Sequence, residues 1–209
     1  MADGNQYKGT TTVGLTCENG VVLASEKRAT MGNFIASKDA KKIYQIDDRL
    51  SMATAGAIGD AQTLVRIISA ETKLYKIRRE EPMTVGAMAT LLSNILFTRR
   101  YFPYLVHLIV GGIDKKGPGL YSLDALGGQI EEKKAVATGS GSPIAYGVLE
   151  DRYKENMPLR DGVTLAIRAV YAAIKRDSAS GNGIEVVTIT PEEYKTLDST
   201  EISKIVDKL

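Results

Sequence analysis

Residues 10–26 read TTTVGLTCENGVVLASE, and this segment gives the clearest indication of secondary structure at the start of the chain. Residues 10–17 are β-branched and alternating, which indicates a strand, and residues 21–26 form the apolar run of a return strand. The intervening Glu18-Asn19-Gly20 is typical of a hairpin turn. The sequence therefore predicts an antiparallel hairpin whose first strand begins at a threonine.

Beyond the hairpin, the spacing of apolar residues alternates between that of strands and that of helices. Strands are predicted over residues 43–46, 50–55, 104–113, 119–123, 129–132, 135–138 and 184–189. Helices are predicted over residues 59–79, after Pro82, over 142–154 and over 161–176. The capping box Thr190-Pro191-Glu192-Glu193 predicts that a terminal helix opens there, whereas residues 199–209 carry no recognisable motif.

The order of these elements constrains the fold class. Helices come in pairs between groups of strands, so a doubly wound parallel sheet is disfavoured. Two antiparallel sheets, each covered on its outer face by a helix pair, would bury every apolar stripe. We therefore expect an α+β fold, a four-layer αββα sandwich. No linker rich in proline, glycine or serine divides the chain, so residues 10–209 are expected to form one domain, preceded by residues 1–9 as a tail or a processed leader.

The composition excludes several chemistries. Cys17 is the only cysteine and His107 the only histidine, which rules out an internal disulfide, a cysteine-based zinc site and any pair of histidines. We expect no metal and no cofactor. The net charge of +2 demands neither nucleic acid nor an anionic membrane as partner. No apolar run approaches the roughly 20 residues that span a bilayer, and we expect a cytoplasmic protein.

His107 lies within the apolar run of residues 105–110. This context predicts a position on a core strand, facing a neighbouring strand, rather than a catalytic role.

The motifs that remain favour a nucleophile that needs no histidine. The segment Gly139-Ser140-Gly141-Ser142-Pro143-Ile144 has isoleucine where a dinucleotide-binding loop requires glycine, and no Walker or Gly-x-Ser-x-Gly motif occurs. Cleavage of the Gly9–Thr10 bond would leave an α-amine beside the Thr10 hydroxyl. Such an amine titrates near pH 7.7–8.0, where a general base is useful. One residue would then supply nucleophile and base, although Thr10 could also simply begin a strand.

Glu26 and Lys42 are candidate partners if both side chains point toward Thr10. The hairpin register decides this for Glu26. A two-residue Asn-Gly turn would pair Thr10 with Ala29 and place Glu26 on the opposite face. A three-residue loop with Gly20 in the left-handed conformation would pair Thr10 with Arg28, with Glu26 on the side of Thr10. The catalytic hypothesis requires the second register.

The small polar segment Arg176-Asp177-Ser178-Ala179-Ser180-Gly181 has two interpretations. In the first, it ends a helix, with Gly181 as the residue after the cap. In the second, it contributes to a functional site.

Together these motifs resemble the proteasome β subunit, in its single-type archaeal form. The resemblance rests on residues 9–14, Arg28-Ala29-Thr30, Lys41-Lys42, Ala55-Gly56 with Gly59-Asp60, residues 139–142 and residues 176–181. It extends from Gly9 to about Ile189. It implies the sandwich of the N-terminal nucleophile hydrolases and the activity of a threonine endopeptidase.

The resemblance also implies the roles of individual residues. The nucleophile falls on Thr10, freed by autocatalytic cleavage at Gly9–Thr10, and the oxyanion donor on the backbone N–H of Gly56. The acid falls on Glu26, where many relatives have aspartate, and the essential lysine on Lys42. Supporting groups fall on Ser140, Asp177 and Ser180. A small uncharged substrate pocket would be lined by Ala29, Thr30, Ala40, Thr54 and Ile58.

The implied assembly is a homo-heptameric β ring, stacked on a second β ring and on α-subunit rings. Its substrate would be unfolded polypeptide, delivered by an ATP-dependent unfoldase through the α rings. The alternatives are a non-catalytic ring scaffold and an HslV-like threonine peptidase. The presence of Thr10 and Lys42 argues against the scaffold, and residues 176–181 argue against the HslV-like enzyme.

Overall fold

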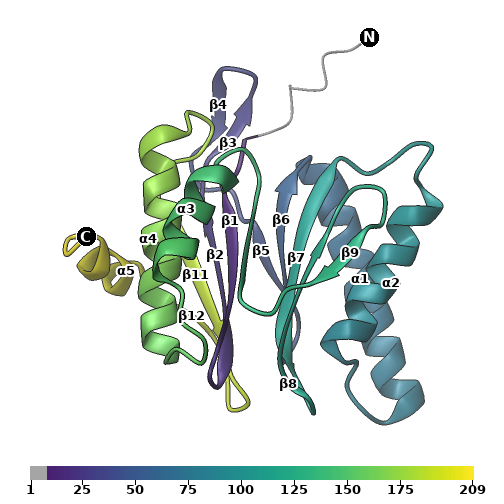
Figure 1. Ribbon diagram of the computed structural model, residues 1–209. Helices are drawn as coiled ribbons and strands as arrows, with labels where there is room; N and C mark the ends of the chain where they lie inside the picture. Colours follow the sequence, from purple (N-terminus) through teal and green to yellow (C-terminus); the bar gives the residue numbers. More distant parts are fainter. Residues whose placement is uncertain (1–8) are drawn as a thin grey trace.

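The computed structural model describes residues 9–209, which form two five-stranded sheets lying face to face (Figure 1). The strand order of the first sheet is β10 (Ala135–Thr138), β1 (Thr12–Cys17), β2 (Gly20–Glu26), β11 (Ile184–Ile189) and β12 (Tyr194–Thr196). The order of the second is β5 (Ile43–Asp47), β6 (Leu50–Gly56), β7 (Val106–Asp114), β8 (Gly117–Leu123) and β9 (Gln129–Glu131). All neighbouring strands in both sheets are antiparallel, as predicted.

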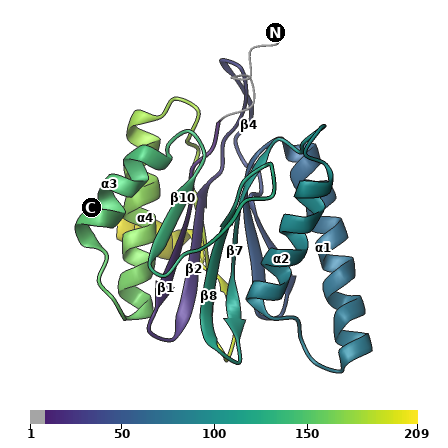
Figure 2. The same ribbon diagram turned by 45° about the vertical axis from the view of Figure 1, so that its right-hand side comes forward.

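Helices cover the outer face of each sheet (Figure 2). The first sheet carries α3 (Ser142–Arg152) and α4 (Leu159–Arg176), and the second carries α1 (Ile58–Arg79) and α2 (Val85–Thr98). A short fifth helix, α5 (Ser199–Val206), packs outside this arrangement against α4 and β11. The four-layer αββα sandwich is thus confirmed, with one additional helix at the C-terminus. None of the helices in the described part of the chain is long and apolar enough to cross a membrane.

Three apolar cores hold the layers together. One lies between the first sheet and α3–α4, a second between the other sheet and α1–α2, and a third between the two sheets. The central core contains Val21 and Leu23 of β2 and Ile109 of β7, all fully buried. Burying each such side chain contributes about 1.5–3 kcal/mol. This packing fixes the ends of β1, β2 and β6, from which the candidate site is built.

The register of the first hairpin differs from both predicted alternatives. Cys17 pairs with Gly20, so the turn contains only Glu18 and Asn19. Gly20 does not adopt the left-handed conformation, because it is not one of the described glycines with a positive φ. Consequently the backbone N–H of Glu26 donates to the carbonyl of Thr11, and the bulged turn that the catalytic hypothesis required does not form.

The predicted helix at residues 190–193 is also wrong. The Thr190 hydroxyl accepts hydrogen bonds from the N–H groups of Glu192 (3.3 Å) and Glu193 (3.1 Å), the contacts that a helix cap would make. Here they close a turn instead, because β12 folds back and pairs with β11. The helix starts later, where the Asp198 side chain caps α5 by accepting from Thr200 N at 2.8 Å.

A second hairpin escaped the sequence analysis. Strands β3 (Ala29–Met31) and β4 (Phe34–Ser37) form a two-stranded sheet of their own at the top of Figure 1. Gly32 at the turn has φ +59°, a conformation that favours glycine. The hairpin is largely exposed, so it lacks the alternation of buried and exposed residues by which a strand is recognised.

Candidate active site

Thr10 lies just before β1 and is buried, with 4% of its surface exposed. Lys42, directly before β5 of the other sheet, donates from Nζ to Thr10 Oγ1 at 3.0 Å. The Thr10 hydroxyl itself donates to the carbonyl oxygen of Gly9, the residue on the other side of the expected cleavage point. The hydroxyl is therefore next to the carbonyl group that it would attack in self-cleavage.

The Glu26 carboxylate contacts the ammonium of Lys42, although Glu26 pairs with Thr11 and not with a residue on the side predicted from the sequence. Its Oε1 accepts from Lys42 Nζ and, at 3.3 Å, from the N–H of Thr11. Its Oε2 accepts from the N–H groups of Arg28 (2.6 Å) and Gly181 (2.9 Å). Glu26 is fully buried at the end of β2, and these four donors compensate its charge. The predicted contact thus forms through Lys42, without the predicted register.

Lys42 uses all three of its ammonium protons. Besides Thr10 and Glu26 it donates to the carbonyl of Arg28 at 2.6 Å. Burial lowers the pKa of Lys42, and the nearby Glu26 carboxylate opposes that shift. Since three oxygen acceptors surround Nζ, the geometry is that of a charged ammonium beside the threonine hydroxyl. This arrangement stabilises negative charge that develops on Thr10 Oγ1.

A second network reaches Thr10 from the far side. Asp177, the residue that caps the C-terminus of α4, accepts hydrogen bonds at 2.6 Å from both Ser140 and Ser180. Ser140 Oγ also lies 3.3 Å from Thr10 N. The seryl hydroxyl therefore links the carboxylate of Asp177 to the nitrogen that would become the α-amine in the expected cleavage.

The helix-end interpretation of residues 176–181 accounts for part of this segment. Helix α4 does end at Arg176, but Gly181 is not the left-handed residue after the cap; Asn182 (φ +63°) and Gly183 (φ +113°) have that geometry. Gly181 is required for another reason. A Cβ at this position would lie 2.3 Å from the guanidinium of Arg28.

Gly56 ends β6 beside Thr10 in a conformation that excludes a side chain. Its φ is +120°, and a Cβ would lie 2.1 Å from the carbonyl oxygen of Leu105. Gly56 and Thr10 line the same two cavities. The placement is compatible with the expected role of its N–H toward an oxyanion.

The first of these cavities contains all five predicted substrate-binding residues. Its volume is about 350 Å³, within the range of small-molecule sites. It extends from Thr10 along the β3–β4 hairpin and the start of α1. The five residues are Ala29, Thr30, Ala40, Thr54 and Ile58, and Lys41, Lys42 and Tyr44 also line the cavity.

The second cavity, about 430 Å³ in volume, corrects the prediction for His107. His107 lies on β7 as expected and pairs with Ala55 of β6, but its side chain is exposed rather than part of the core. It lines the cavity together with Gly56, Ser140 and Thr10. Ile109 and His107 lie on the same face of β7. Ile109 packs in the core between the two sheets, whereas His107, nearer the end of the strand, lines the cavity.

Two contributors to the site were missed. Thr11 donates its N–H to Glu26, and its hydroxyl lies 2.7 Å from that of Ser180, so it connects the two networks. Arg28 donates to the Ser178 carbonyl and the Asn182 side chain, both at 2.7 Å, and holds the loop after α4 in place. The motif around Arg28 was visible in the sequence, but its function depends on a loop 150 residues away.

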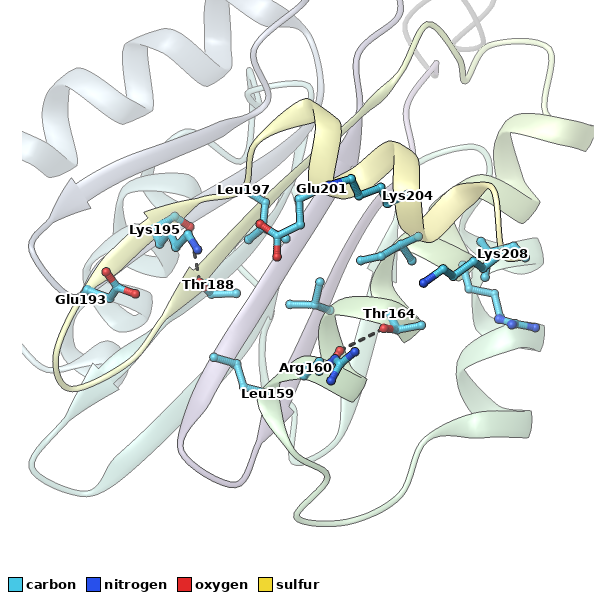
Figure 3. A pocket seen from close by; sticks show the side chains of 14 residues that line it. Leu159, Arg160, Thr164, Thr188, Glu193, Lys195, Leu197, Glu201, Lys204 and Lys208 are labelled. Carbon is cyan, nitrogen blue, oxygen red and sulfur yellow. Dashed lines mark hydrogen bonds between the residues drawn. The ribbon is translucent and has the colours of Figure 1, made fainter.

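A larger cavity, of about 470 Å³, lies between α4, β12 and α5 and shares no residue with the site (Figure 3). Its lining is mixed, with basic side chains such as Arg160, Lys195, Lys204 and Lys208 and the acidic Glu193 and Glu201. In residues 9–209, no cluster of three or more histidine, cysteine or acidic residues could hold a metal ion.

A four-layer sandwich with a buried threonine before its first strand is the architecture of an N-terminal nucleophile hydrolase. Comparison with known sequences agrees with this class, because the model of the family described as proteasome subunit matches residues 6–189. The chain belongs to the proteasome subunit family.

Relatives named proteasome subunit beta are similar over nearly the whole chain. The protein from Methanohalophilus mahii is 64% identical over 209 residues and covers 100% of both chains. The protein from Archaeoglobus profundus is 66% identical over 203 residues, which cover 97% of this chain and 94% of the relative. The protein from Methanosarcina barkeri is 61% identical over 204 residues, covering 97% of each. These relatives agree with the resemblance to archaeal β subunits.

Proposed function

We propose that this chain is the catalytic β subunit of a 20S proteasome core particle, a threonine endopeptidase with Thr10 as nucleophile. The observation that carries the proposal is the contact between Lys42 Nζ and Thr10 Oγ1 at 3.0 Å, with the buried Glu26 carboxylate behind the lysine. A structural lysine would not need to lie against a threonine hydroxyl inside a cavity. A ring scaffold without activity would have no use for this arrangement.

Activation begins with the precursor's own peptide bond. Thr10 Oγ1 attacks the Gly9 carbonyl carbon, and the bond between Gly9 and the Thr10 nitrogen breaks as that nitrogen takes up a proton. This step leaves the Thr10 α-amine free and an ester on Oγ1, and water then hydrolyses the ester, which releases residues 1–9 and restores the Thr10 hydroxyl. Residues 1–8 lie outside the described residues, so the argument for this propeptide rests on the Gly9–Thr10 contact.

Substrate cleavage repeats the same attack on another chain. The hydroxyl proton passes to the α-amine of Thr10, directly or through one water, as the oxygen bonds to the substrate carbonyl carbon. The Gly56 N–H donates a hydrogen bond to the developing oxyanion. Such a donor stabilises the transition state by roughly 3–4 kcal/mol in comparable sites. The amine then protonates the leaving nitrogen, and water hydrolyses the acyl-enzyme ester. Ser140, held by Asp177, orients the amine through the 3.3 Å contact to its nitrogen.

The proposed assembly is a homo-heptameric β ring, stacked on a second β ring and on α-subunit rings. Unfolded polypeptide would reach Thr10 through the α rings after an ATP-dependent unfoldase has threaded it. Most of the residues that line the first cavity are small and uncharged, apart from Lys41, Lys42, Tyr44 and Met31, and this lining favours an apolar side chain immediately before the cut.

The test is a peptidase assay on particles assembled from this chain and its α-subunit partner. The wild-type particle should hydrolyse short apolar peptides and an unfolded protein, and Thr10→Ala particles should hydrolyse neither. Thr164→Ala is the matched control, since Thr164 lies on α4 and donates only to the Arg160 carbonyl. Assembled wild-type particles without peptidase activity would leave the scaffold as the better description.

A further inference from the structure

His107 faces the nucleophile across a cavity that the proposed mechanism does not use. It pairs with Ala55, the residue before Gly56, so its side chain stands next to the expected oxyanion donor. The remaining lining residues are glycine, alanine, serine, threonine and proline. Among the described residues that line this cavity, His107 is therefore the one with an ionisable side chain.

The position of Gly9 indicates which side of the scissile bond each cavity serves. A Cβ on Gly9 would lie 2.1 Å from Thr30 Oγ1. Thr30 lines the first cavity and not the one with His107. Gly9 itself lines both cavities, but a side chain at its position would point toward Thr30 and hence toward the first cavity. We infer that the residue after the cut faces the other cavity, which His107 lines.

We propose that His107 forms a binding subsite for the residue immediately after the cut and favours side chains that end in an oxygen acceptor, carboxylates above all. This inference rests on the proposed peptidase function. The imidazole ring offers an N–H donor that a side-chain oxygen can accept. Within residues 9–209, no acidic side chain lines the cavity to compete for this donor. The Asp177 carboxylate does not line this cavity and already accepts hydrogen bonds from Ser140 and Ser180.

Because the cavity with His107 is open to solvent, we expect His107 to change the relative rates at which different substrates are cleaved, rather than to decide whether they are cleaved at all. The cavity is open and His107 is exposed, so a lost contact is replaced by water. A single side-chain hydrogen bond of this kind changes relative affinity by about threefold to tenfold. The preference should appear mainly in KM, because His107 binds the side chain and takes no part in the proton transfers.

The experiment uses internally quenched peptides that are identical except for the residue after the cut, which is Glu, Gln, Leu, Lys or Gly. Mass spectrometry of the products verifies the cut position. For assembled wild-type particles, kcat/KM for the Glu peptide should exceed that for the Leu peptide about threefold to tenfold, with the Lys peptide lowest. In His107→Ala particles this ratio should fall to nearly one, and His107→Gln, which keeps an N–H donor, should retain part of it.

The Gly peptide is the internal control, because it has no side chain to reach the imidazole. Its cleavage should be the same in all three particles. An unchanged Glu-to-Leu ratio in His107→Ala particles that still cleave the Gly peptide would overturn the subsite. If wild-type particles cleave none of the peptides, the proposed peptidase function fails instead.

Discussion

Lys42 Nζ lies 3.0 Å from Thr10 Oγ1, although the two residues are 32 positions apart in the sequence and precede strands of different sheets. Lys42 directly precedes β5 of the second sheet, and its carbonyl accepts from the N–H of Thr54 on β6. Thr10 precedes β1 of the first sheet. The contact therefore joins the two sheets at the open end of the sandwich, and the packing between the sheets determines the catalytic distance.

Replacing Lys42 with alanine should yield an assembled but inactive particle. The change removes the ammonium from Thr10 and leaves the Glu26 carboxylate buried without its countercharge. We expect kcat to fall at least about a hundredfold, in line with the loss of electrostatic stabilisation from an active site. Peptidase assays and gel filtration of the same preparation measure both properties.

Lys38→Ala provides the control for this change, because Lys38 is exposed and outside the cavity beside Thr10. It should retain wild-type activity. If Lys42→Ala particles keep activity within tenfold of wild type, Lys42 is a structural residue only.

Asp177→Asn should disturb the network behind the Thr10 nitrogen. The Asp177 carboxylate accepts from Ser140 and Ser180 at one oxygen and from the N–H of Ala179 at the other. An amide would direct its NH₂ group at one of these donors in either orientation. The unsatisfied contact costs about 1–3 kcal/mol, and kcat should fall at least about tenfold.

The conservative change Asp198→Asn is the comparison for Asp177→Asn. Asp198 caps α5 at the surface and is remote from the cavities at Thr10. Asparagine is an equally good cap, so activity and melting temperature should stay near those of wild type. Equal kcat in the two variants would remove Asp177 from the catalytic network.

Gly56→Ala should lower both stability and activity. The new Cβ would lie 2.1 Å from the Leu105 carbonyl in a backbone with φ +120°, so the end of β6 must shift and the position of the Gly56 N–H must change. We expect the free energy of unfolding to fall by about 3 kcal/mol or more.

The variant Gly32→Ala separates the effect of conformational strain from that of the clash. Gly32 also has positive φ, but nothing lies within 4 Å of its Cβ position, so the cost should be about 1 kcal/mol without loss of activity. Thermal melting and peptidase assays distinguish the two; similar results for both would contradict the clash.

Cys17 should be unreactive in the folded protein. Burial, reinforced by the Asp161 carboxylate, raises the pKa of this thiol from 9.0 to about 12. A higher pKa means less thiolate, so at pH 8 the reactive fraction falls about a thousandfold. Ellman's reagent should therefore detect no thiol in native particles and one per chain in guanidinium chloride. Rapid reaction of native particles would show that the layer of α4 over β1 opens readily.

The sequence predicted those parts of the fold that local patterns determine. The apolar stripe of α4 depends on the side that each residue presents to the core, and the periodicity of the sequence records that side. The turn at Thr190 shows the limit of such patterns. Its hydroxyl makes the hydrogen bonds of a helix cap, but the pairing of β12 with β11 decides which structure follows.

The candidate site was predictable to a similar degree. Residue identities came from the motifs, whereas the means by which Glu26 reaches Lys42 depends on the hairpin register, and neither predicted register forms. The exposure of His107 could not be predicted, because its position in an apolar strand matches that of a core residue. It is exposed since the strand extends to the open end of the sandwich, where the two sheets no longer cover one another.

The most direct test of the central claim, that Thr10 is a nucleophile released from its own precursor, is the intact mass of the chain after assembly with the α-subunit partner. We expect wild-type chains to lose residues 1–9 and to begin at Thr10, because an acylated Thr10 nitrogen cannot act as a base. Thr10→Ala chains should keep these residues, since the attacking hydroxyl is absent. Full-length wild-type chains in an active particle would contradict the account.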